Sequence, residues 1–138
     1  MSVPKMIKRK ETPTASQQIF KPSVSAFPSI TESDEYILDI RKAKHNAETG
    51  RVVLVGTPSR ILEDESTQIF KDCPVCLPDT FESDDFSPLE RLFNACNLDI
   101  ATGCKMSDFV GKKVCVYIDV NKYPDGSKYY NGTDFAEL

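Results

Sequence analysis

The sequence contains a single histidine and lacks any long apolar run. His45 is the one histidine in 138 residues, and no apolar stretch comes near the roughly 18 residues that cross a membrane. The first lysines are not followed by the apolar segment of a secretory signal peptide. These absences argue against a membrane protein and against catalysis that depends on histidine acid–base chemistry. We therefore expect a non-enzymatic protein of the cytoplasm.

Cysteine occurs five times, and an odd number argues for reduced thiols rather than a disulfide framework. Cys73 and Cys76 have the C-x-x-C spacing of half a zinc site, which Cys96 and Cys104 would complete. The second pair is too widely spaced for a zinc knuckle, and Cys96 falls on the apolar stripe of a predicted helix. Buried free thiols are the favoured interpretation, so we predict no metal or other cofactor. A redox role for C-x-x-C needs a βαβ setting, which the pattern does not indicate.

The charge is distributed unevenly along the chain. The net charge is -4, and because residues 1–22 hold five basic groups and one acidic group (+4), residues 23–138 carry -8. An acidic body repels nucleic acid unless its charges are segregated. The acids do gather, at residues 63–65 and 79–85, so segregation is plausible. Residues 1–33, rich in Lys, Pro, Ser and Thr, are interpreted as a flexible basic arm.

Three strands are predicted in the first half of the chain. Alternation of apolar and polar residues predicts a strand at 35–44, and a second follows at 51–57. The continuous valines of the second strand suggest burial on both faces, and Pro58 is expected to end it. A third strand is predicted at 66–73. The segment 74–86 holds further prolines and several acids, and we interpret it as irregular.

A short helix is the clearest local signal. Ser87 is a suitable N-cap, Pro88 suits the first helical position, and Glu90 stands where a capping box needs it. Four apolar residues then follow with the spacing of one helical stripe: Leu89, Leu92, Phe93 and Cys96. One further helical turn is predicted at 106–109.

A long hairpin follows. Its first strand, residues 114–121, places four apolar residues on one face: Val114, Val116, Ile118 and Val120. Residues 123–127 contain the Pro and Gly of a turn, and the chain then resumes in aromatic, β-favouring residues.

Three strands, a helix and two strands are the order of the OB-fold. We therefore predict a mainly β, five-stranded OB-fold barrel over residues 34–138, with one helix between strands 3 and 4. An SH3-like barrel, or an α+β sheet with one helix, would give a similar pattern.

Cations and aromatic rings gather where an OB-fold binds its ligand, on strands 2 and 3 and on the loops joining strands 1–2 and 4–5. Cations that follow phosphates and rings that stack on bases are what single-stranded nucleic acid requires. The alternative is that the tyrosines pack the hairpin and the lysines are ordinary surface charge. The candidate nucleic-acid-binding residues are Lys42, Lys44, His45, Arg51, Phe70, Lys71, Lys122, Tyr123, Lys128, Tyr129 and Tyr130.

The order of the short motifs resembles small single-stranded-DNA-binding proteins of tailed phages. The resemblance covers about residues 34–136. It is carried by the stretch Glu35–Lys44, a loop ending in Gly50, Val52–Val55, the helix Leu89–Leu98 followed by Asp99, Phe109–Val114 and the Lys122–Tyr130 hairpin. It implies sequence-tolerant binding of single-stranded DNA in phage or viral replication or recombination, in the host cytoplasm. It also implies replication or recombination proteins as further partners. The positions that match are Lys44, Arg51, Lys122, Tyr123, Lys128 and Tyr130.

The acidic body leaves a second function open. A protein-interaction module that docks onto a replication or repair enzyme, through the barrel edge or the acidic insert, would not bind oligonucleotides.

Overall fold

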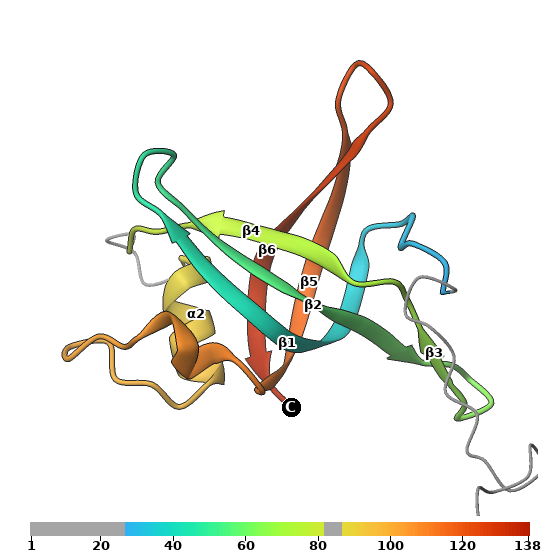
Figure 1. Ribbon diagram of the computed structural model, residues 1–138. Helices are drawn as coiled ribbons and strands as arrows, with labels where there is room; N and C mark the ends of the chain where they lie inside the picture. Colours follow the sequence, from blue (N-terminus) through green and yellow to red (C-terminus); the bar gives the residue numbers. More distant parts are fainter. Residues whose placement is uncertain (1–26, 82–86) are drawn as a thin grey trace, which may run out of the picture.

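The computed structural model describes residues 27–81 and 87–138 (Figure 1). Residues 1–26, which make up most of the predicted arm, lie outside the described residues. The elements in chain order are β1 (Asp34–Asn46), β2 (Arg51–Ile61), β3 (Thr67–Ile69), β4 (Cys73–Pro78), α2 (Pro88–Ala95), the 3-10 turn η3 (Met106–Phe109), β5 (Lys113–Lys122) and β6 (Lys128–Glu137).

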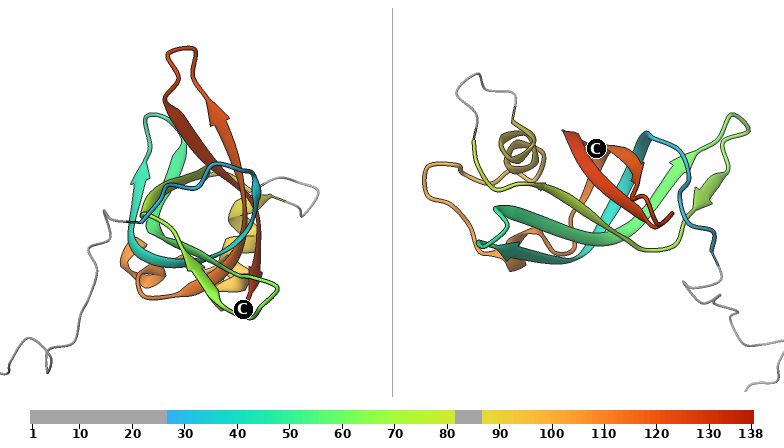
Figure 2. Two further views of the ribbon diagram at one scale, coloured as in Figure 1. Left: turned by 90° about the vertical axis from the view of Figure 1, so that its right-hand side faces the viewer. Right: turned by 90° about the horizontal axis from the view of Figure 1, so that it is seen from above.

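The six strands form one mixed sheet that closes on itself. Its order is β1-β5-β6-β4-β2-β3, and β1 also pairs with β2. This extra pairing makes a ring of five hydrogen-bonded strands (Figure 2) and leaves β3 at the edge. The β4–β6 pairing is parallel and the other pairings are antiparallel. The prediction of a mainly β fold with one helix before the last two strands is confirmed.

The third strand of the ring is not where the sequence placed it. Within the predicted strand 66–73, the structure has only the short β3, Thr67–Ile69, and Cys73, with which β4 begins. The ring continues through β4. The interpretation of 74–86 as irregular is therefore wrong for its first part. Pro74 and Pro78 nevertheless pair with Val55 and Arg51 of β2, and the residues between them alternate inward and outward.

The second strand also differs from its prediction. It continues through Pro58 to Ile61, since Pro58 pairs with Leu38 and its carbonyl accepts a 2.9 Å hydrogen bond from the N–H of Phe70. A residue's N–H and C=O point to the same side of a strand, so the missing donor faces β3 rather than β1. The strand is not buried on both faces, because Val53 and Val55 are half-buried.

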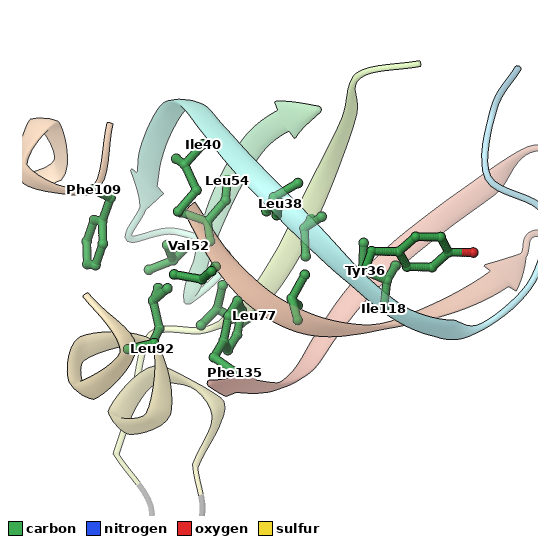
Figure 3. Packing of buried hydrophobic residues seen from close by; sticks show 14 of the residues in the cluster. Tyr36, Leu38, Ile40, Val52, Leu54, Leu77, Leu92, Phe109, Ile118 and Phe135 are labelled. Atoms are coloured by element: carbon green, nitrogen blue, oxygen red, sulfur yellow. The ribbon is translucent and has the colours of Figure 1, made fainter. Parts of the chain in front are cut away.

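The core fills the inside of the ring. The inward residues of the strands, such as Leu38, Leu54 and Val116, are at most 1% exposed. Figure 3 shows Leu92 of α2 and Phe109 of η3 at one end of this core, with Tyr36 at the other. The predicted helix is confirmed, and the N–H of Glu90 donates to Ser87 Oγ at 3.3 Å.

The strand β1 closes the ring because it pairs with both β5 and β2. It pairs with β5 over Asp34–Asp39 and with β2 from Ile37 onward, with a bulge at Arg41 between the Ile40–Gly56 and Lys42–Val55 pairs. At Gly56 a Cβ would lie 2.4 Å from the backbone oxygen of Asp39. The two strands can approach this closely because β2 has no side chain at that point.

The segment before β1 packs against the ring. Residues 27–33, assigned to the arm from sequence, contact the ring: Ile30 is fully buried and the N–H of Lys71 donates to the Pro28 carbonyl at 2.8 Å.

Among residues 27–81 and 87–138, no helix has the length and apolar composition of a membrane span.

Candidate nucleic-acid interface

The bulge at Arg41 decides which cations of β1 face outward. Beyond it Lys42 pairs with Val55 and Lys44 pairs with Val53. Residues paired across two strands share a face of the sheet. Since Val53 and Val55 alternate with buried neighbours and lie on the outside of the ring, both lysines lie there too, and both are exposed or half-buried.

His45 points the other way. It pairs with the buried Val52 and lies toward α2, where it lines a small cavity with Leu89 and Phe93. Its Nε2 is 2.8 Å from Asp79 Oδ2, and the N–H of Asp79 donates to the Gly50 carbonyl at 3.0 Å. The structure therefore separates His45 from Lys42 and Lys44, close to which it stands in the sequence.

The outer surfaces of β2 and β4 form one floor. Val53 pairs with Cys76, Val55 with Pro74, and Arg51 with Pro78, so these six side chains share the outward face. Burial raises the pKa of the Cys76 thiol and the positive charge of Arg51 opposes this, as expected of close neighbours. The floor is thus small and apolar, with a cation at one end.

The β5–β6 hairpin adds an aromatic edge to this floor. Asn131 of β6 pairs with Cys76 of β4 and faces outward with it. Tyr129, two residues earlier, lies on the same face because strand side chains alternate. The ring of Tyr123, which is 54% exposed, lies against that of Tyr129 with centroids 4.5 Å apart.

Tyr130 has a different role. It pairs with Val120, and both pack against the core. Burial raises the pKa of the Tyr130 hydroxyl. Lys122 and Lys128 pair with each other on the same face of the hairpin as Tyr130. The three tyrosines grouped from the sequence therefore divide into two rings in contact, Tyr123 exposed and Tyr129 half-buried, and a single ring, Tyr130, that packs against the core.

Phe70 and Lys71 lie apart from this surface. Phe70 is 6% exposed and meets the ring of Tyr36 edge-on at 5.5 Å. The guanidinium of Arg60 lies over both rings, 5.8 Å and 5.5 Å from their centroids. Phe70 therefore helps to close the end of the core opposite α2. Lys71 is exposed just after β3.

We define the basic–aromatic face as the outward residues of the two hairpins and of β2 and β4: Lys42, Lys44, Arg51, Val53, Val55, Pro74, Cys76, Tyr123 and Tyr129. The β1–β2 and β5–β6 hairpins rise from the same side of the ring, with β4 running between their bases (Figure 1). Within the described ranges, no carboxylate is ion-paired with Lys42, Lys44 or Arg51. Three cations without a carboxylate partner in those ranges thus lie on one face with the rings of Tyr123 and Tyr129.

The β4 part of the floor was not predicted from the sequence. The signal was present, because Cys73, Val75 and Leu77 alternate with polar or proline positions and are all buried. The prolines at 74 and 78 outweighed that alternation. Asp79, the partner of His45, lies just beyond β4, and no sequence pattern indicated this contact.

The cysteines do not assemble a zinc site. Cys73 and Cys76 are three residues apart on β4 and lie on opposite faces of it. Cys96 is buried beside α2, and burial raises its pKa to about 11. In the part of the chain that the structure describes, no three His, Cys, Asp or Glu side chains are grouped closely enough to hold a metal ion.

A scan against protein-family models and a search of curated proteins gave no match to this chain.

Proposed function

We propose that this protein binds single-stranded DNA without a strong sequence preference and without catalysing a reaction on it. One observation carries the proposal: cations with no ion pair in the described ranges, a small apolar floor and two tyrosine rings in contact, one exposed and one half-buried, follow one another on the basic–aromatic face. Phosphates favour the cations, and bases favour the rings and the floor, because single-strand binding combines electrostatic attraction with stacking.

We further propose that the ring is an OB-fold barrel with β3 as an addition to the β2–β4 connection. Taken without β3, the strands of the ring are neighbours in the order β1-β2-β4-β6-β5-β1. An OB-fold binds oligonucleotides on its second and third strands and on the loops that flank them. In this chain those elements are β2, β4 and the two hairpins, which are the elements of the basic–aromatic face.

The chemistry of this face favours tolerance of sequence. Stacking accepts every base because every base has a π-face. Val53, Val55 and Pro74 present no side-chain donor or acceptor that would read a base edge. Lys44 and Arg51 are placed for phosphates, which carry no sequence information. Replication or recombination of a phage or viral genome, with proteins of those processes as partners, is the setting we propose.

Fluorescence anisotropy with a labelled oligo-dT at two salt concentrations tests the proposal. We expect binding at low salt that weakens as salt rises, with a slope of about -0.7 in log K against log salt for each phosphate that the protein neutralises. Absence of binding at low salt, or binding that salt does not change, would overturn it.

A second candidate rests on the β2–β3 hairpin. Ile61, Leu62 and Ile69 are 66%, 40% and 39% exposed, and β3 pairs only with β2 among the described strands. Exposed apolar residues on an open strand edge are features of a peptide-docking site. A protein-interaction module of this kind would retain a replication or repair enzyme from the host in a pull-down, and Ile61→Asp would abolish the retention.

A further inference from the structure

A cavity of about 320 Å³ opens at the far end of β2 from Arg51. Side chains from β1, β2, β3 and β5 surround it, together with Phe27, which precedes the first strand. Its lining is Phe27, Ile37, Asp39, Arg41, Thr57, Ser59, Thr67, Ile69 and Lys113. None of these residues was singled out from the sequence, and the size is at the lower end of the usual range for small-ligand sites, about 300–1,000 Å³.

The walls of the cavity combine an apolar part with polar groups. Phe27, Ile37 and Ile69 provide the apolar part. The hydroxyls of Ser59 and Thr67 have no hydrogen bond to any other described residue, and Lys113 has no ion pair within the same ranges. A ligand with a flat apolar body and polar edges would satisfy both parts.

Arg41 is held at this cavity by its bulge. Its Nε donates to Thr57 Oγ1 at 2.8 Å, and Thr57 in turn donates to Asp72. The carboxylates of Asp72 and Asp39 lie 3.8 Å and 3.9 Å from the guanidinium nitrogens, beyond hydrogen-bond distance. Arg41 therefore keeps donors for a further anion, and Asp39 keeps acceptor capacity.

The cavity belongs to the same surface as the basic–aromatic face. Thr57 and Ser59 alternate along β2 with buried residues, as Arg51, Val53 and Val55 do, so all five side chains face outward. Thr57 is six residues from Arg51, about 20 Å at roughly 3.3 Å per residue. A nucleic-acid strand that follows β2 from Arg51 would therefore reach the cavity.

We infer that this cavity is a subsite for one unstacked base of the bound strand, and that it prefers a base with an amino group. This inference rests on the proposed function. Phe27 offers a ring for stacking, and Asp39 accepts a hydrogen bond from N4 of cytosine or N6 of adenine. Thymine presents a carbonyl oxygen at the corresponding position, which Asp39 repels. Lys113 and Arg41 are placed for the adjoining phosphate.

Anisotropy of the full chain with labelled oligo-dC and oligo-dT of equal length, at neutral pH and one salt concentration, tests the inference. We expect oligo-dC to bind about 5-fold more tightly than oligo-dT, a modest preference set by one subsite on an otherwise sequence-tolerant surface. Asp39→Asn should remove most of this preference, and Phe27→Ala should weaken both oligonucleotides about 5-fold. Lys113→Gln should weaken both oligonucleotides, because it removes a cation placed for the adjoining phosphate. The matched controls are Tyr117→Ala for Phe27→Ala and Lys105→Gln for Lys113→Gln. They replace exposed residues outside the cavity and should bind as the wild type does.

The outcomes separate the subsite from the function. If the wild type binds neither oligonucleotide, the proposed function fails and the subsite fails with it. If it binds both equally, and Asp39→Asn and Phe27→Ala bind unchanged, the function stands and the subsite is overturned. If the wild type retains a host enzyme in a pull-down and the cavity variants lose it while their oligonucleotide binding is intact, the subsite is also overturned. Should Phe27→Ala fail to fold, as judged by thermal unfolding, Asp39→Asn and Lys113→Gln decide the question, because both replace outward side chains.

Discussion

The rings of Tyr123 and Tyr129 lie against each other at the tip of the β5–β6 hairpin, with their planes inclined at 38°. Each ring restricts the movement of the other, so the exposed Tyr123 and the half-buried Tyr129 form one platform. Such a platform is ready for a base because less side-chain freedom is lost when the base stacks on it. The sequence grouped these tyrosines with Tyr130, which the structure instead packs against the core.

We predict that Tyr129→Ala weakens binding of oligo-dT by about 5- to 100-fold, the effect of losing one stacked base. The reason is that both the stacking surface and the support for Tyr123 are removed. Anisotropy at fixed salt measures the change. Tyr117→Ala is the control, since it removes a tyrosine ring that is 41% exposed and lies outside the basic–aromatic face. Equal losses in both variants would contradict the assignment of the platform.

The salt dependence of oligonucleotide binding tests the role of the cations on the basic–aromatic face. Replacing Lys44 or Arg51 by Gln should lower the slope of log K against log salt by about 0.7 for each phosphate that is no longer neutralised. Lys105→Gln removes the same charge from an exposed site near η3 and should leave the slope unchanged. His45→Gln should also leave it nearly unchanged, because His45 lies toward α2 and bonds Asp79. A larger effect at His45 than at Lys44 would contradict the division of the two faces.

The raised pKa of the Cys73 thiol predicts that the folded protein loses stability at alkaline pH. Burial, and next the charge of Asp72, raise its pKa from 9.0 to about 12. The folded protein favours the neutral thiol, so this contribution is complete below about pH 9 and declines as pH rises toward 12. The free energy of unfolding should fall by up to about 1.4 kcal/mol per pH unit for this group.

Urea unfolding at pH 8 and pH 10.5 measures that decline. Cys73→Ala should make it shallower, although Cys96 and the buried tyrosines leave part of it in place. Cys115→Ala, at a half-buried outward position, should retain the wild-type decline. A decline that is the same in all three proteins would show that Cys73 ionises as readily in the fold as in the unfolded chain.

The close crossing of β1 and β2 predicts that Gly56→Ala is destabilising. The added Cβ would meet the backbone of Asp39, which cannot move without disturbing the ladder. We expect a loss of about 1–3 kcal/mol, typical of overpacking, measured by urea unfolding. Gly103→Ala is the comparison: its Cβ meets no atom within 4 Å and only the positive φ of 73° is strained. A smaller loss at Gly56 than at Gly103 would contradict the steric explanation.

The parts of the fold that the sequence predicted are those with a local cause. Ser87 and Pro88 start α2 because a cap and a fixed φ act within one turn. The β5–β6 hairpin follows from the alternation of Val114, Val116 and Ile118 and from the turn around Gly126, whose φ is 91°. The prediction failed at β4, where proline propensity opposed pairing and the contacts with β2 and β6 prevailed.

The candidate site was predicted as a set of residues but not as an arrangement. Alternation and turn residues determined that Lys44, Arg51 and Tyr129 stand on hairpins. Only the tertiary structure decided which of them share a face, since one extra residue at Arg41 changes the side to which every following side chain of β1 points. Lys44 therefore faces the floor of β2 and β4 while His45 turns to Asp79, because a bulge depends on how two strands pair and not on either strand alone.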